Sequence, residues 1–123
     1  MSISFNAFHQ KDNAFHFVDL PDDIELCLSS ANGTDLLNTL GIEDSCSSAP
    51  WPIEAFRALV TVARRKRLDY RSPEIPTTAH QEPGHAMVID CGRSEGYIER
   101  RLEDLSDFLN ESREAGATHI GWG

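Results

Sequence analysis

The first quarter of the chain alternates apolar and polar residues, which is the pattern of strands that bury one face. Ile3 and Phe5, for example, alternate with serine and asparagine. The polar run at 11–13 and the proline at Pro21 interrupt the pattern, as turns do. The three strands expected from this pattern cover residues 2–9, 14–20 and 24–29.

Three later segments carry apolar residues at the spacing of an amphipathic helix. These expected helices cover residues 34–40, 52–68 and 94–116. The last has an apolar stripe that consists of Ile98, Leu102, Leu105 and Leu109. We expect Ser94 to cap its start and Gly116 to end it.

The remaining segments complete the predicted order of elements. Residues 43–52 have the composition of a linker, and the prolines of residues 69–84 predict a long exposed loop. Short apolar runs at 86–91 and 117–123 predict two further strands, which flank the last helix. This strand, helix and strand are long enough to form a β-α-β unit with one parallel pair.

The predicted order is therefore β-β-β-α-α-β-α-β. Strands that precede the helices and are joined by short turns are typical of the α+β class. We expect a mainly antiparallel sheet with two to three helices packed on one face. A chain of 123 residues is within the range of one globular domain, here residues 1–123.

The charge of the chain narrows the class of partner. Twenty acidic residues against 11 basic ones give a formal net charge of −9. This balance disfavours nucleic acid and anionic membranes as partners and favours a basic protein, although acidity also serves solubility. We expect a cytoplasmic protein for three reasons. The three cysteines lack metal-ligand spacing, no apolar stretch is long enough to span a bilayer, and the sequence shows no leader pattern.

Acidic residues recur every fourth position along the last expected helix, where neighbouring like charges repel by roughly 0.2 to 0.5 kcal/mol per pair. This acidic row consists of Glu95, Glu99, Glu103, Asp107 and Glu111. The candidate partner-binding residues are Glu99, Glu103, Asp107, Glu111 and Glu114 of this helix, with Asp22, Asp23, Glu43 and Asp44 from the first half of the chain. The alternative is a helix face that is simply solvated.

Other chemistry is less strongly indicated. The basic run at 64–67 lies at a helix end without interleaved aromatic residues, so stabilisation of that end or pairing with the chain's own acids is favoured over nucleic-acid binding. His80, His85 and Cys91 leave open a small metal-dependent or cysteine-based hydrolase. No phosphate-binding, dinucleotide or nucleophile-elbow motif is present, and we expect neither a catalytic site nor a metal or cofactor.

The small size, the acidity and the last third of the chain are similar to those of the acidic immunity proteins that bacteria encode beside polymorphic or contact-dependent toxins. That third has a strand, a helix of the form YIxxRLxxLxxFL, a glycine and a final strand ending in IGWG. The resemblance implies a non-catalytic protein that neutralises a cognate toxin domain, often a basic nuclease. The chain itself is expected to be a monomer or a homodimer, the latter with the acidic row of one copy against residues 64–67 of the other.

Overall fold

The computed structural model describes residues 2–76, 78–80, 84, 88–90 and 92–123. The strands are β1 (Ser2–Lys11), β2 (Ala14–Phe17), β3 (Leu26–Ser29), β4 (Trp51–Pro52), β5 (Thr78–His80), β6 (Val88–Asp90) and β7 (His119–Trp122). The helices are α1 (Ser30–Thr39), α2 (Ile53–Lys66) and α3 (Tyr97–Glu114), with a short 3-10 helix η1 (Asp22–Ile24). The α+β class is confirmed.

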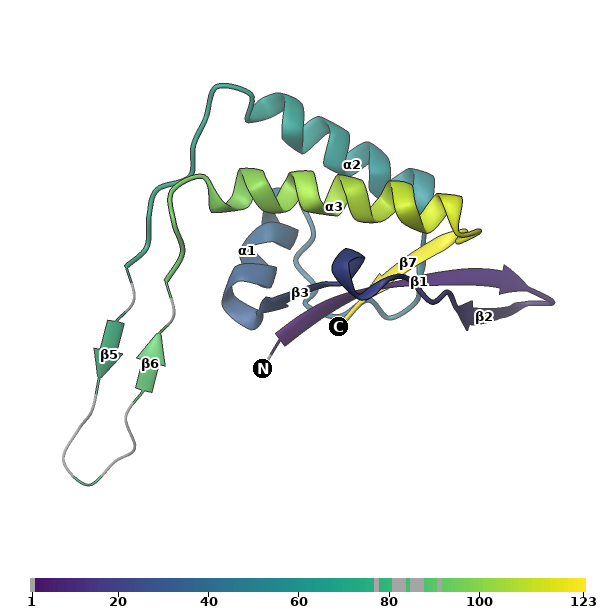
Figure 1. Ribbon diagram of the computed structural model, residues 1–123, viewed down its shortest axis with the longest axis horizontal. Helices are drawn as coiled ribbons and strands as arrows, with labels where there is room; N and C mark the ends of the chain where they lie inside the picture. Colours follow the sequence, from purple (N-terminus) through teal and green to yellow (C-terminus); the bar gives the residue numbers. More distant parts are fainter. Residues whose placement is uncertain (1, 77, 81–83, 85–87, 91) are drawn as a thin grey trace.

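The main sheet has five antiparallel strands. Its order is β2-β1-β7-β4, and β3 pairs with the first half of β1, on the same side as β2. Helices α2 and α3 lie together over one face of this sheet, and α1 packs beside β3 (Figure 1). The predicted mainly antiparallel sheet with helices on one face is therefore correct.

The turn between β1 and β2 follows from its sequence. Asp12 and Asn13 both have positive φ, at 53° and 63°, and they join the paired residues Lys11 and Ala14. Aspartate and asparagine tolerate this backbone region better than other residues that have a side chain, and two such residues make the tight turn that matches the twist of a hairpin.

The core fills the space between the sheet and the helices. Ile3, Phe5 and Ala7 of β1 are buried, while the residues between them are only partly covered. An aromatic group at the centre brings Phe56 of α2 within 5.5 Å of Trp122 of β7, measured between ring centroids. The alternation in the sequence therefore predicts correctly which side of β1 faces the helices.

Helix α1 begins four residues before its predicted start. The Ser29 hydroxyl caps it by accepting a hydrogen bond from the Asn32 amide at 3.3 Å. Gly33 lies within the helix because a side chain there would collide with β1: an added Cβ would be 2.9 Å from Ile3 Cβ. The contact between the two elements, which the sequence does not show, places a glycine where helix propensity argues against one.

Two predictions about the last third are wrong. Helix α3 begins after Gly96, which has a φ of 74°, and not at Ser94. The predicted parallel pair does not form, because β6 pairs with β5 in a separate antiparallel sheet and β7 pairs antiparallel with β1 and β4. The segment predicted as loop contains β5, which is closer to β6 in the sequence than β7 is. Figure 1 shows this hairpin projecting away from the main sheet.

The other boundaries shift by a few residues. The predicted second and third strands are shortened because η1 forms between them, and α2 starts after Pro52. The final strand places Ile120 and Trp122 in the core, as predicted. Within the described residues, no helix has the length and apolar character that crossing a bilayer requires.

Candidate functional site

Helix α3 forms the rigid base of the candidate site. Its predicted apolar stripe is buried, and Phe108 extends it. The helix packs along α2 and reaches across to β3 and η1. Its remaining side therefore displays acidic residues at fixed positions between α2 and the edge of the sheet.

Glu99 does not belong to the exposed acidic surface. Arg67 Nη1 and the Ser72 amide each donate to Glu99 Oε1 at 2.9 Å, and the Ser72 hydroxyl donates to Oε2 at 2.8 Å. Only 18% of the side chain is exposed. The prediction that the whole acidic row faces solvent is thus wrong at Glu99, because this carboxylate ties the segment after α2 to α3.

The titration of Glu99 reflects this environment. Desolvation raises the pKa of the carboxyl, but the hydrogen bonds from the Ser72 hydroxyl, from the backbone amides of Glu99 and Ser72 and from Arg67 together outweigh it. The pKa of Glu99 is therefore lowered from its ordinary value. Its charge stabilises the fold and is already neutralised by a neighbour.

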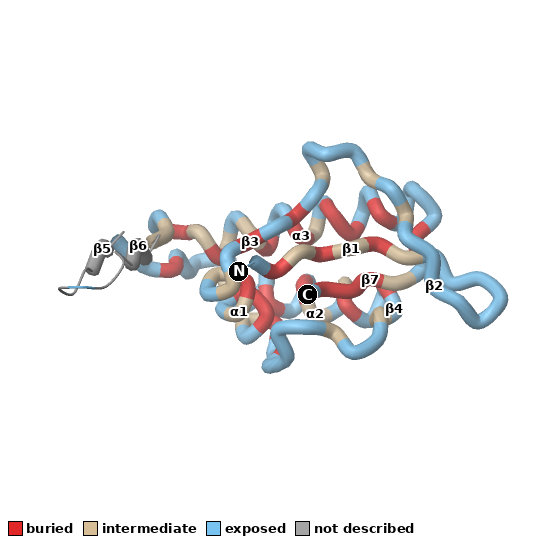
Figure 2. Tube along the Cα trace, turned by 90° about the horizontal axis from the view of Figure 1, so that it is seen from below, coloured by how far each residue is buried: buried red, intermediate tan, exposed pale blue. Residues whose placement is uncertain are grey.

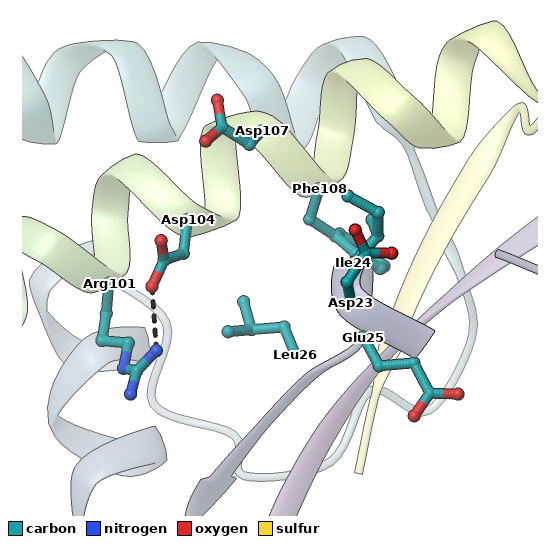
Figure 3. A pocket seen from close by; sticks show the side chains of 8 residues that line it. All are labelled: Asp23, Ile24, Glu25, Leu26, Arg101, Asp104, Asp107 and Phe108. Carbon is teal, nitrogen blue, oxygen red and sulfur yellow. Dashed lines mark hydrogen bonds and ion pairs between the residues drawn. The ribbon is translucent and has the colours of Figure 1, made fainter. Parts of the chain in front are cut away.

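A groove of about 210 Å³ lies between α3 and η1, and we call it the acidic groove. Its acidic residues are Asp23, Glu25, Asp104 and Asp107. Figure 3 shows Asp104 and Asp107 on successive turns of α3, with Asp23 and Glu25 across from them at η1. The fold thus places Asp23 and Asp107, two acids that are far apart in the sequence, on the lining of one groove.

Among the described residues, Arg101 is the one basic residue that lines the acidic groove. Its Nη1 donates to Asp104 Oδ2 at 2.8 Å, and its guanidinium lies over the Tyr97 ring at 5.0 Å from the centroid. Hydrogen bonding to Tyr97 and to Asp104 raises the pKa of Arg101. One guanidinium against four carboxylates leaves the groove strongly negative.

The other predicted residues of α3 are exposed but do not line this groove. Glu103 lines an adjacent hollow together with Tyr97 and Arg100. Glu111 and Glu114 lie toward the C-terminal end of the helix, Glu114 beside Arg113. None of these three acids has an ion pair among the described residues, since Arg113 pairs with Glu54.

Glu43 and Asp44 lie away from the acidic groove. The Asp44 carbonyl accepts a hydrogen bond from Trp122 Nε1 at 3.0 Å, and the Ser47 amide donates to the Trp122 carbonyl. The segment that holds them therefore runs beside β7, whereas η1 leads into β3, and Figure 2 shows β3 and β4 on opposite sides of β1 and β7. The nine predicted acids do not form one surface.

Two of the four acidic residues of the acidic groove were absent from the predicted set. Asp104 lies one position beyond Glu103 and so falls outside the row at every fourth residue. Glu25 lies in a segment predicted as strand, with no sign that η1 forms there. These two carboxylates line the groove because η1 packs against α3, a contact that the sequence does not show. The sequence does show that Asp104 belongs to the acidic helix.

Two of the four residues in the basic run at the end of α2 bond within the molecule, and one of them, Arg67, pairs with an acid of the chain as predicted. Arg64 Nη1 donates to the Ser106 hydroxyl at 3.2 Å, and Arg67 binds Glu99. Its other two members, Arg65 and Lys66, are exposed in the last turn. These contacts join α2 to α3 and involve two of the four basic residues.

The alternative hydrolase site lies largely outside the described residues. Neither His85 nor Cys91 is described, and only the backbone of His80 is, in β5. Among the side chains that the structure describes, no group of three or more histidine, cysteine or acidic residues has the arrangement of a metal site.

Comparisons with protein-family models, curated proteins and solved structures gave no match to this chain.

Proposed function

We propose that this protein is a non-catalytic immunity or inhibitor protein that binds a cognate, basic toxin domain through the acidic groove. The observation that carries the proposal is the convergence of Asp23, Glu25, Asp104 and Asp107 from two separate segments onto one concave surface. Four carboxylates on one surface give it a negative potential, and that potential attracts a cationic partner.

The setting of the acidic groove favours a protein partner over a small ligand. The groove lies beside a second hollow of about 500 Å³ that shares Arg101, Asp104 and Asp107. Together they form a strip along α3 in which five acidic residues outnumber two arginines, Arg100 and Arg101. A lysine or arginine side chain fits such a strip, and the net charge of −9 increases the rate at which a basic partner encounters it.

A reducing, cytoplasmic location is part of this proposal. Cys27 and Cys46 are both free thiols on the surface of the described chain. Exposed thiols persist where glutathione and thioredoxin keep them reduced. An immunity protein of this kind would meet its toxin in the producing cell.

The partner can be sought first in the genome. The proposal predicts a neighbouring gene for a large secreted protein whose C-terminal domain is basic. Expression of that domain alone should arrest growth, and co-expression of this chain should restore it. Neighbouring genes that encode no such domain, or a toxic domain that this chain neither binds nor neutralises, would contradict the proposal.

The binding site can be tested with two matched double variants. Asp104→Asn with Asp107→Asn removes two charges from the acidic groove, and Glu43→Gln with Asp44→Asn removes two from the opposite edge of the sheet. We expect the first pair to weaken toxin binding in calorimetry by about tenfold or more and the second to leave it within about twofold. Equal effects would mean that net charge, and not the groove, determines binding.

A further inference from the structure

Two arginines from separate segments meet at the start of α3. Gly96 precedes the helix, and a Cβ added to it would be 3.3 Å from Arg71 Nη1 and 3.3 Å from Arg100 Nη1. The two nitrogens are therefore at most twice that distance apart. Arg71 belongs to the segment after α2, which passes the start of α3 (Figure 1), and Arg100 lies in the first turn of α3. We call these two side chains the arginine pair.

The guanidinium of Arg100 is fixed by uncharged acceptors. Its Nη1 donates to the Glu95 carbonyl at 2.8 Å, and its Nη2 donates to the Ser94 hydroxyl. These bonds orient the group without neutralising it. Arg100 and Ser94 also line the second hollow, beside the acidic groove, so this side of the arginine pair is open to a ligand.

The position of the arginine pair is electrostatically unfavourable in the free protein. Like charges repel, and cations at the start of a helix also oppose its dipole, whose positive end lies there. The other arginines of residues 67–72 and 93–101 each pair with a carboxylate: Arg67 with Glu99, Arg93 with Asp35 and Arg101 with Asp104. Among the described residues, neither Arg71 nor Arg100 forms an ion pair. A bound anion would stabilise this arrangement.

The backbone amides at the start of α3 already have acceptors. The Gly96 amide donates to the Ser72 carbonyl at 2.9 Å, the Tyr97 amide to the Ser94 carbonyl at 3.2 Å and the Ile98 amide to the Ser72 hydroxyl at 3.3 Å. An anion at this place would therefore be bound by the guanidinium groups. The planar set of donors on a guanidinium matches the paired oxygens of a carboxylate or a phosphate.

We propose that the arginine pair binds a carboxylate group, and that in the toxin complex this group is an aspartate or glutamate side chain of the toxin domain. Only the identity of the partner rests on the function proposed above. Glu103 and Asp104 line the same hollow as Arg100, so a carboxylate with one charge meets less repulsion than a phosphate with nearly two. A partner must then carry an acid beside its basic residues, and this pattern adds selectivity to charge attraction.

The site can be tested without the toxin by an NMR titration of the full chain with sodium acetate, compared with sodium chloride at the same ionic strength. Acetate should shift the amide signals of Gly96 and Tyr97 until they saturate. We expect Arg71→Gln with Arg100→Gln to weaken acetate binding about tenfold or more. The matched control is Arg65→Gln with Lys66→Gln, the same change of charge at exposed residues of α2, and it should bind acetate as the wild type does.

Three results of this titration would overturn the proposal. They are equal shifts in acetate and chloride, equal acetate binding by the two double variants, and saturation by inorganic phosphate without saturation by acetate. Signals elsewhere in the spectrum report whether each variant is folded. Arg71→Gln alone removes half of the arginine pair and keeps the bonds of Arg100, so it serves if the double variant unfolds, and it should weaken acetate binding severalfold.

The toxin complex gives a second test, in which net charge and the arginine pair predict opposite results. Each double variant makes the chain more negative by two charges, which by itself favours a basic partner. Calorimetry should show equal or tighter toxin binding for Arg65→Gln with Lys66→Gln and about tenfold weaker binding for Arg71→Gln with Arg100→Gln. Equal or tighter binding by the latter would overturn the role in the complex. A toxin domain that does not bind the wild type contradicts the proposed function, and the acetate titration still decides whether the site exists.

Discussion

Residues with the same spacing in the sequence have different roles in the fold. Glu99 and Glu103 are both acids of α3, four positions apart, yet Glu99 accepts three hydrogen bonds and Glu103 has no ion pair among the described residues. The difference arises from the segment after α2, which returns past the start of α3 and brings Ser72 and Arg67 to Glu99. Charge at Glu99 therefore stabilises the fold, and charge at Glu103 remains available to a partner.

Glu99→Gln should destabilise the protein by about 1 to 2 kcal/mol, because the substitution removes the charge that strengthens the hydrogen bonds from Arg67 and Ser72. Glu103→Gln is the matched control, and its effect should stay within about 0.5 kcal/mol of zero. Urea denaturation of the two variants measures both values. Equal stabilities would contradict the role assigned to Glu99.

The stabilisation from Glu99 should depend on pH. Since the folded-state pKa lies below the ordinary value of 4.5, the contribution is fully present above that value and is lost as the pH falls through the lower folded-state pKa. The difference in unfolding free energy between the wild type and Glu99→Gln should therefore narrow in acid. Denaturation at a series of pH values tests this, and a difference that stays constant into strong acid would contradict it.

At the scale of elements, local patterns identify helices and strands, while contacts between elements decide their ends and partners. Helix α1 includes Gly33 because β1 passes too close for a side chain. Strand β6 pairs locally with β5 and stays outside the main sheet, and β7 pairs antiparallel with β1. The predicted β-α-β unit failed because connection length permits a parallel pair but does not require one.

Gly33→Ala tests the contact between α1 and β1. Alanine favours a helix by about 1 kcal/mol, but its methyl group would meet Ile3 Cβ, so we expect a net destabilisation of about 1 to 2 kcal/mol. Asn38→Ala, at an exposed position of the same helix, should be neutral or slightly stabilising. The thermal midpoint measures both. A stabilised Gly33→Ala variant would show that β1 and α1 move apart at little cost.

At the scale of the whole molecule, the negative charge is divided between two edges of the sheet. Asp23 and Asp107 meet at the acidic groove, and Glu43 and Asp44 lie at the opposite edge. The helix layer is braced by the pairing of Arg67 with Glu99. The molecule thus presents its acids on two separate surfaces, of which the proposed toxin-binding site is the acidic groove.

Association of the toxin domain should slow as salt rises, because the long-range field of the protein is then screened. Between low and physiological ionic strength we expect the association rate constant to fall by about tenfold or more. The double variant Asp104→Asn with Asp107→Asn should reduce the salt dependence of the association rate constant more than the double variant Glu43→Gln with Asp44→Asn does. Stopped-flow measurements over a salt series test this, and equal slopes would indicate steering by net charge alone.

The sequence by itself determined the fold class, the buried faces of β1, β7 and α3, and the acidic character, since apolar periodicity and charge are properties of the chain that folding cannot change. Only the tertiary structure decided which carboxylates are neighbours, which one is neutralised and which strands pair. Those outcomes depend on distances between segments remote in the sequence, such as Asp23 and Asp107 or Ser72 and Glu99. The path of the chain sets these distances, and no local pattern encodes them.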